Sequence, residues 1–171
     1  MYISFLRGIN VSGKNKIEMN ALKILYEALG FKEVNTYLNT GNVIFSSSLP
    51  KGDIGIKIEE AIQSKFDLDI EVIVRSKEEL KRLIESYPFG HEGKNRYVTL
   101  LKTSSDVIDK EKILEASKPL DKTYFTSNEI MLFVPEGYGK SKLTNRFFEK
   151  MTLSIATTRN MNTLEKIYKK M

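Results

Sequence analysis

Apolar and polar residues recur along this chain in two patterns, which together predict a mixture of strands and helices. Short runs rich in β-branched and aromatic residues are typical of strands, whereas apolar residues spaced three and four apart are typical of helices. The first half contains four expected strands and two expected helices, at residues 2–6, 18–29, 34–38, 43–45, 53–66 and 70–74. Their order is strand, helix, strand, strand, helix, strand, which is the order of a ferredoxin-like βαββαβ unit.

Local signals support these boundaries. Gly30 follows the first helical stripe in the position of a C′ glycine, and residues 39–42 (Asn-Thr-Gly-Asn) form a tight hairpin signal between the two middle strands. Asp53 is the expected N-cap of the second helix. The first unit is therefore predicted to span residues 1–76.

The same order begins again after a connector at residues 77–93, where a short helix over 77–86 precedes a turn-rich join. The expected strands and helices of the second half lie at residues 96–101, 109–117, 122–126, 130–134, 142–151 and 153–156. A final helix is expected from about Asn162, which forms a capping-box-like pattern with Glu165. The two halves share no residue-level repeat. The repeated order of elements therefore fits either duplication of one unit or two unrelated units with the same topology. The predicted fold is α+β, with two tandem ferredoxin-like βαββαβ units, antiparallel sheets and a C-terminal helix; the second unit spans residues 94–171.

Composition excludes several classes of function. Of the 171 residues, 41% are hydrophobic and 29% are charged, which is typical of an ordered globular protein. The absence of cysteine excludes a disulfide framework, a thiolate zinc site and a cysteine nucleophile. No apolar run approaches the ~20 residues that cross a bilayer, and residues 1–6 are no signal peptide, so we expect a cytoplasmic protein without a membrane partner. His91 is the one histidine, so neither a metal site nor a Ser-His-Asp hydrolase is expected, and no cofactor is predicted.

The net charge of +5 is concentrated at the two ends of the chain. Residues 1–17 carry a charge of +3 and residues 137–171 carry +6, whereas the segment between them carries −4. If the two ends meet in the fold, they form a positive surface that favours an anionic partner. The alternative is that Lys169 and Lys170 only complement the C-terminus of a helix.

Residues 8–14 match the spacing G-x-x-x-x-G-K between a predicted strand and a predicted helix. In a phosphate-binding loop such glycines let the backbone approach the phosphates, and the lysine binds them. Asn15 stands where a nucleotide-hydrolysing P-loop has the Ser or Thr that binds magnesium, and a hairpin follows where such a fold continues a parallel sheet. We therefore expect an anion-binding loop in a broader sense, with Arg7, Lys14 and Lys16 around it, or else a flexible turn with solvated lysines.

Two further segments are candidates for binding an anion. Gly139-Lys140-Ser141 precedes a predicted helix, whose free N-terminal amides favour anions, although a glycine-rich turn capped by Ser141 explains the segment better. Arg159 and Asn160 belong to Thr-Thr-Arg-Asn at 157–160 and have no capping explanation. The guanidinium of Arg159 suits a phosphate or a carboxylate, including a carboxylate of the protein itself.

Nucleic-acid binding is the main alternative class, because RNA-recognition modules share the βαββαβ order. Those modules place stacking aromatic residues on the third strand, whereas residues 42–46 (Asn-Val-Ile-Phe-Ser) contain one aromatic residue. Binding of phosphates by the basic ends stays open and would depend strongly on salt. The alternating acids Asp67, Asp69 and Glu71 fit a solvated sheet face better than a catalytic pair.

Four stretches of this sequence resemble the bacterial domain-of-unknown-function family 1697. They read Leu-Arg-Gly-Ile-Asn-Val at 6–11, Gly-Asn-Val-Ile-Phe at 41–45, Ser-Lys-Leu-Thr-Asn at 141–145 and Thr-Thr-Arg-Asn at 157–160. The resemblance implies a small cytoplasmic protein of two ferredoxin-like halves, with no established activity, substrate or cofactor. Ser12 replaces the family's usual second glycine. Met161 replaces its usual tryptophan, which weakens any stacking on a ligand but allows filling of the core.

Three hypotheses of function follow. The favoured one is binding, with turnover left open, of a small phosphorylated or carboxylated ligand at a basic site formed by the two signature segments. The predicted ligand-binding residues are cationic or carry amides: Arg7, Asn10, Lys14, Lys16, Lys140, Arg159 and Asn160. Sequence-independent nucleic-acid binding is the second hypothesis. The third is a structural or protein-interaction role, in which the signature loops only hold the two halves together.

Overall fold

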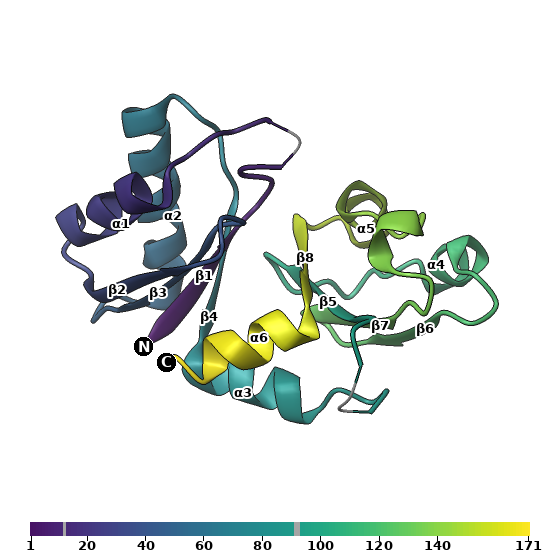
Figure 1. Cartoon of the computed structure of the whole chain (residues 1–171). Coiled ribbons are helices and arrows are strands. Elements are labelled where there is room, and N and C mark those ends of the chain that lie inside the picture. The colour runs from purple at the N-terminus through teal and green to yellow at the C-terminus, as the bar shows by residue number, and fades with distance from the viewer. Residues whose placement is uncertain (12, 91–92) are drawn as a thin grey trace. The chain divides into compact units, whose positions relative to one another are not determined.

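A computed structural model of the chain describes residues 1–11, 13–90 and 93–171 (Figure 1). Ser12, one of the two departures from the family pattern, and His91 lie outside these described residues. The chain divides into two compact units, one formed by Met1–Lys81 with Ile167–Met171 and the other by Arg82–Lys166. Both passages of the chain from one unit to the other fall inside helices, namely α3 (Lys77–Glu85) and α6 (Met161–Tyr168). The domain limits expected at residues 76 and 94 remain a prediction.

The first unit contains one four-stranded antiparallel sheet with the strand order β2-β3-β1-β4. Its elements follow the chain as β1 (Tyr2–Leu6), α1 (Met19–Ala28), β2 (Lys32–Tyr37), β3 (Asn42–Ser46), α2 (Lys51–Phe66) and β4 (Val72–Ser76). Helices α1 and α2 lie on one face of this sheet (Figure 1). The strand order is that of a ferredoxin-like unit, as the sequence predicts.

The core of the first unit forms because the helical stripes and the alternating strand residues meet on that face. Leu22 and Tyr26 of α1 and Ile58 of α2 are fully buried there. The Tyr26 hydroxyl lies 2.8 Å from the hydroxyl of Ser4 on β1, which gives both buried groups a partner. Burial raises the pKa of Tyr26, so the phenol stays protonated at neutral pH.

The predicted N-cap of α2 is wrong. The helix begins two residues earlier than Asp53, at Lys51, and Pro50 occupies the N-cap position with φ −57°. Proline is well tolerated at a helix start, because its fixed φ suits the position and no N–H is needed there. Asp53 lies in the first turn instead, where its negative charge favours the amide end of the helix.

The second unit repeats the architecture, with an antiparallel four-stranded sheet in the order β6-β7-β5-β8. Its elements are β5 (Arg96–Leu101), α4 (Lys110–Ala116), β6 (Lys122–Phe125), β7 (Glu129–Phe133), the 3-10 helix η1 (Tyr138–Lys140), α5 (Asn145–Thr152) and β8 (Ala156–Asn160). Residues of α4 and α5 join one hydrophobic cluster with residues of the sheet. The predicted α+β fold of two ferredoxin-like units is confirmed.

The expected strand at 153–156 is wrong in its position. Leu153 has a left-handed φ of 53° and ends α5, and the strand runs instead from Ala156 to Asn160 beside β5. The segment that the sequence treats as a candidate binding loop, 157–160, is therefore an edge strand. Its two threonines favour this state because β-branched side chains pack well on a pleated sheet.

One hydroxyl of the second unit is buried without a hydrogen-bond partner among the described residues, that of Thr123 on β6. A buried hydroxyl without a partner costs ~1–3 kcal/mol. We expect Thr123→Val to raise the free energy of unfolding by about 1 kcal/mol, since valine keeps the shape and removes the unpaired group. Urea denaturation of both proteins measures this difference.

Thr126 supplies the matched control for this prediction. Its hydroxyl accepts the backbone N–H of Glu129 at 2.9 Å, so Thr126→Val is expected to lower stability. An equal loss of stability in both variants would contradict the expectation for Thr123.

Candidate functional site

The segment 7–17, which we call the basic loop, connects β1 to α1 and is fixed to the β2–β3 turn. The backbone N–H of Leu6, at the end of β1, donates to the carbonyl of Gly41 in that turn at 2.8 Å. The side chain of Ile9 is buried against Gly41, where an added Cβ would lie 2.9 Å from it. Ile17 at the other end of the loop is also buried. The loop is thus anchored at both ends by core residues.

Asn10 holds the shape of the basic loop from within. Its side-chain amide donates to the carbonyls of Ile17 and Asn39, both at 2.9 Å, and its side-chain carbonyl accepts the N–H of Ile17 at 2.9 Å. Its φ of 53° is a left-handed conformation that asparagine adopts more readily than most residues. Because these bonds engage both polar atoms of the side chain, Asn10 acts as a positioning residue for the loop.

The tip of the basic loop presents positive charge to solvent. Lys14 and Lys16 are exposed, and within the described parts of the chain neither ammonium group has a hydrogen-bond or ion-pair partner. Arg7 is half-buried, and its backbone N–H donates to the carbonyl of Glu71 at 2.9 Å. The loop therefore combines anchored ends with two uncommitted cations.

The geometry differs from that of a P-loop. Helix α1 begins at Met19, five residues after Lys14, so the lysine does not stand at the helix N-terminus where a P-loop cradles phosphate. The N–H of Lys14 donates instead to the carbonyl of Val11 at 3.0 Å, closing a turn at the tip. Any anion bound here is held mainly by side chains.

The remaining predicted residues, Lys140, Arg159 and Asn160, lie in the second unit. Asn160 caps α6, because its side-chain carbonyl accepts the N–H of Asn162 at 2.9 Å, and its amide donates to the carbonyl of Lys94 at 2.8 Å. The predicted capping role of Asn162 is therefore wrong, and Asn160 fills it. Lys140 is exposed in η1, which is separated from α5 by residues 141–144, so it does not directly precede a helix as the sequence suggests.

Arg159 is half-buried on β8, where one of its terminal nitrogens donates to the hydroxyl of Thr157 at 2.7 Å and to the carbonyl of Thr158 at 3.0 Å. Burial lowers the pKa of Arg159 to about 10, which leaves the guanidinium charged at neutral pH. The side chain is thus partly committed to its own strand.

A hydroxyl cluster that sequence reasoning missed links the two signature stretches of the second unit. The Thr158 hydroxyl donates to the side-chain carbonyl of Asn145 at 2.7 Å and lies 2.9 Å from the Tyr138 hydroxyl and 2.8 Å from that of Thr99. Burial raises the pKa of Tyr138 to about 12, so the phenol remains a donor at neutral pH. The hydrogen bond between Thr158 and Asn145 thus joins the stretch 157–160 to the stretch 141–145.

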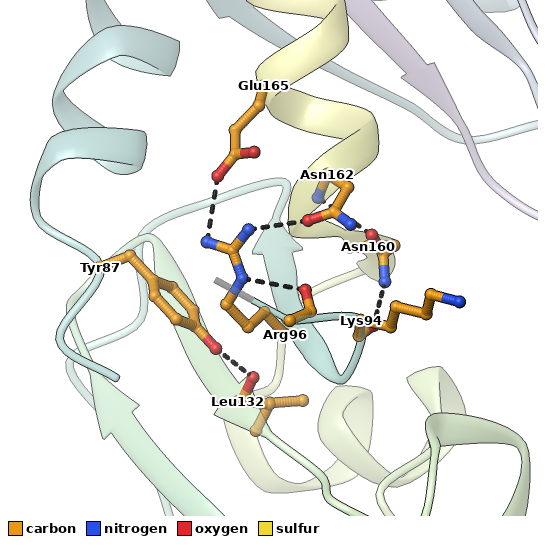
Figure 2. A network of polar contacts seen from close by, with 8 residues as sticks. Tyr87, Lys94, Arg96, Leu132, Asn160, Asn162 and Glu165 are labelled. Atoms are coloured by element: carbon orange, nitrogen blue, oxygen red, sulfur yellow. Dashed lines mark hydrogen bonds and ion pairs between the residues drawn. The ribbon is translucent and has the colours of Figure 1, made fainter. Parts of the chain in front are cut away.

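Figure 2 shows a second network that sequence reasoning missed, around the guanidinium of Arg96 on β5. Arg96 is 2% exposed and donates to the carboxylate of Glu165 at 3.0 Å, to the side-chain carbonyl of Asn162 at 2.7 Å and to the carbonyl of Gly93 at 3.3 Å. The guanidinium carbon lies 5.8 Å from the ring centre of Tyr87. These contacts fix the first turns of α6 to the sheet of the second unit, so this network is structural.

The one aromatic residue of β3, Phe45, lies in the hydrophobic cluster that the sheet of the first unit forms with α1 and α2. RNA-recognition modules stack bases on aromatic side chains of the sheet face that their helices leave open. Phe45 is on the other face, so it does not supply such a stacking surface.

Among residues 1–11, 13–90 and 93–171, no three acidic, histidine or cysteine side chains gather in a way that would suit a metal ion. Nor does any helix in these ranges have the length and apolar character needed to cross a membrane.

Comparisons with known proteins identify one family and one solved structure. Residues 1–131 match the model of a family described as "Protein of unknown function (DUF1697)". A solved structure described as that of the conserved bacterial protein SP0830 from Streptococcus pneumoniae is similar, with 26% identity and a TM-score of 0.73 over 98% of this chain and 96% of that chain. No curated protein matches. The comparisons therefore extend the fold to a relative and leave the ligand to be inferred from geometry.

Proposed function

The chain belongs to DUF1697, a family of unknown function, and we propose that its basic loop binds a small phosphorylated or carboxylated ligand. The observation that carries this proposal is the contrast between the anchored ends of the loop and its uncommitted lysines. Asn10 binds Ile17 and Asn39, and Ile9 packs on Gly41, yet Lys14 and Lys16 have no partner among the described residues. Loops that a rigid scaffold positions and that expose charged groups are typical of binding sites.

The charge distribution supports an anion as the ligand. Residues 1–17 contain three cationic side chains and no acid, so the loop tip meets no nearby carboxylate in the sequence. Lysine is a flexible point charge with three donors and suits both phosphate and carboxylate oxygens. Arg7 remains a third candidate contact, whereas Asn10 positions the loop.

A direct test removes both lysines. We expect the double variant Lys14→Gln/Lys16→Gln to bind pyrophosphate and citrate about 5–30-fold more weakly than the unmodified chain, since each exposed charge pair is worth up to ~1 kcal/mol. Isothermal titration at constant ionic strength measures the affinity, and sodium chloride controls for general screening.

The matched control removes the same charge elsewhere on the first unit. Lys32→Gln/Lys57→Gln lowers the net charge equally but leaves the basic loop intact, so it is expected to keep the affinity for both probes. Equal weakening in the two double variants, or no binding of any anion by the unmodified chain, would contradict the proposal. A salt series with labelled RNA separates this function from the nucleic-acid alternative, which predicts a steep salt dependence.

A further inference from the structure

The two units share one structural feature at the end of their first strand, where the following loop meets the turn of the middle hairpin. We call this meeting point the corner of the unit. In the first unit, Leu6 ends β1 and its N–H donates to Gly41 at 2.8 Å; in the second, Leu101 ends β5 and its N–H donates to Asn128 at 2.9 Å. The sheet register makes these positions equivalent, because Gly41 and Asn128 each precede the residue paired with the next-to-last residue of that strand. Both units thus fix the loop that follows the first strand to the turn of the middle hairpin.

The corners differ in how they are filled. In the first unit the side chain of Ile9 occupies the space over Gly41. In the second unit the equivalent corner holds a depression of about 470 Å³. Its lining combines hydroxyl, charged and apolar side chains from the two segments that meet there: Ser105, Asp106, Ile108, Lys110, Phe125, Thr126 and Ser127. Its volume lies in the range of small-molecule sites, ~300–1,000 Å³.

The depression is held in shape by hydrogen bonds. The N–H of Ser105 donates to the carbonyl of Ser127 at 2.7 Å, and its hydroxyl contacts the carbonyl of Thr152 at 2.6 Å. The hydroxyl of Thr126 on the opposite wall contacts the carboxylate of Glu129 at 2.9 Å. Because the hydroxyls of Ser105 and Thr126 are used in these hydrogen bonds, the polar side chains of the lining that are left for a ligand are those of Asp106, Lys110 and Ser127.

Opposite charges without protein partners face this depression. Over the described ranges, Asp106 and Lys110 make no ion pair with each other or with any other residue, and the Ser127 hydroxyl has no hydrogen-bond partner. The Lys110 ammonium lies 5.6 Å from the ring centre of Phe125, which places the cation beside an apolar surface. A carboxylate and an ammonium group that do not neutralise each other suit a ligand that carries both charges.

We propose that this depression binds a small zwitterion with an apolar side group, of the size of an amino acid or a dipeptide. Asp106 takes the ligand's ammonium group, Lys110 takes its carboxylate, and Ile108 with Phe125 contacts its apolar part. This site belongs to the second unit and does not depend on the basic loop.

Nuclear magnetic resonance titration of the full chain, labelled with ¹⁵N, tests the site. The probe is the dipeptide alanyl-phenylalanine, with N-acetylated and C-amidated forms that each lack one charge. We expect the free dipeptide to shift the amide signals of residues 105–110 and 125–127, with saturation below about 10 mM. Each blocked form is expected to bind at least about fivefold more weakly. No shift in these segments, or equal binding of all three forms, would overturn the proposal.

Substitutions of Asp106 and Lys110 test which residue binds which charged group of the dipeptide. Asp106→Asn is expected to weaken binding of the free dipeptide about fivefold and to leave binding of the N-acetylated form unchanged. Lys110→Met is likewise expected to weaken binding of the free dipeptide about fivefold and to leave binding of the C-amidated form unchanged. Glu111→Gln, an exposed acid outside the lining, is the matched control and should alter neither affinity. The Lys14→Gln/Lys16→Gln variant should bind the dipeptide with unchanged affinity. The dipeptide test therefore does not depend on whether the basic loop binds anions. Loss of binding in that variant would overturn the independence of the site.

Discussion

Gly41→Ala is expected to lower the free energy of unfolding by about 3–4 kcal/mol. Two physical costs add at this position. Gly41 has a left-handed φ of 76°, which costs an L-residue ~1–2 kcal/mol. A Cβ placed there would also lie 2.7 Å from the Cβ of Leu6 and 2.9 Å from Ile9, and overpacking of a core typically costs ~1–3 kcal/mol. Urea denaturation followed by circular dichroism measures the loss.

Two other glycines separate these costs. Gly30 has a φ of 85° but no atom near its position for a Cβ, so Gly30→Ala should carry the backbone cost alone. Gly52 lies in α2 with open space around it, and Gly52→Ala should be neutral or stabilise the helix by up to ~1 kcal/mol. If Gly41→Ala lowers the free energy of unfolding no more than Gly30→Ala does, then Leu6 and Ile9 move aside for the added Cβ without strain.

The same substitution links stability to the proposed function. Displacement of Ile9 would pull Asn10 away from the carbonyl of Asn39, which it reaches at 2.9 Å. The basic loop would then lose one of its fixed contacts, so a Gly41→Ala protein that still folds should bind pyrophosphate more weakly than Gly30→Ala.

The fold was predictable where its signals are local. The stripe of Leu22, Leu25 and Tyr26 lies within one helix, and the spacing alone indicates which face is buried. The Asn-Thr-Gly-Asn hairpin at 39–42 is equally local, because its turn needs a residue with positive φ and Gly41 supplies it. Such features depend on few residues that are close in sequence.

The polar roles could not be predicted, because they depend on partners far away in the chain. The sequence pattern points to Asn162 as the helix cap and gives no such role to Asn160. Only the course of β8 decides that Asn160 caps α6 while Asn162 accepts from Arg96. Arg96 itself carries no motif, and its contact with Glu165 spans 69 positions of the sequence. For the basic loop, the clustering of its cationic residues can be read from the sequence. The anchoring role of Asn10 cannot, because it depends on a hydrogen bond to Asn39, 29 positions away.

The second large effect is expected at Glu165. Glu165→Ala should lower the free energy of unfolding by about 3 kcal/mol, because it leaves the buried guanidinium of Arg96 without its carboxylate. For a chain of this length, that loss corresponds to a fall in melting temperature of ~6–12 °C. Asn162 and Gly93 continue to accept from Arg96, which keeps the cost at the lower end of that for a broken buried pair.

Removal of Arg96 instead of Glu165 should cost less stability. Arg96→Met keeps an apolar stem in the buried position and removes the charge, while the side chain of Glu165 is 29% exposed and is able to turn toward water. The double variant Arg96→Met/Glu165→Ala is then expected to be more stable than Glu165→Ala alone, since no buried charge remains to be compensated. Denaturant titration of all four proteins completes the cycle. Equal losses in the two single variants would contradict this expectation, because they would show that the unpaired guanidinium of Arg96 carries no penalty of its own.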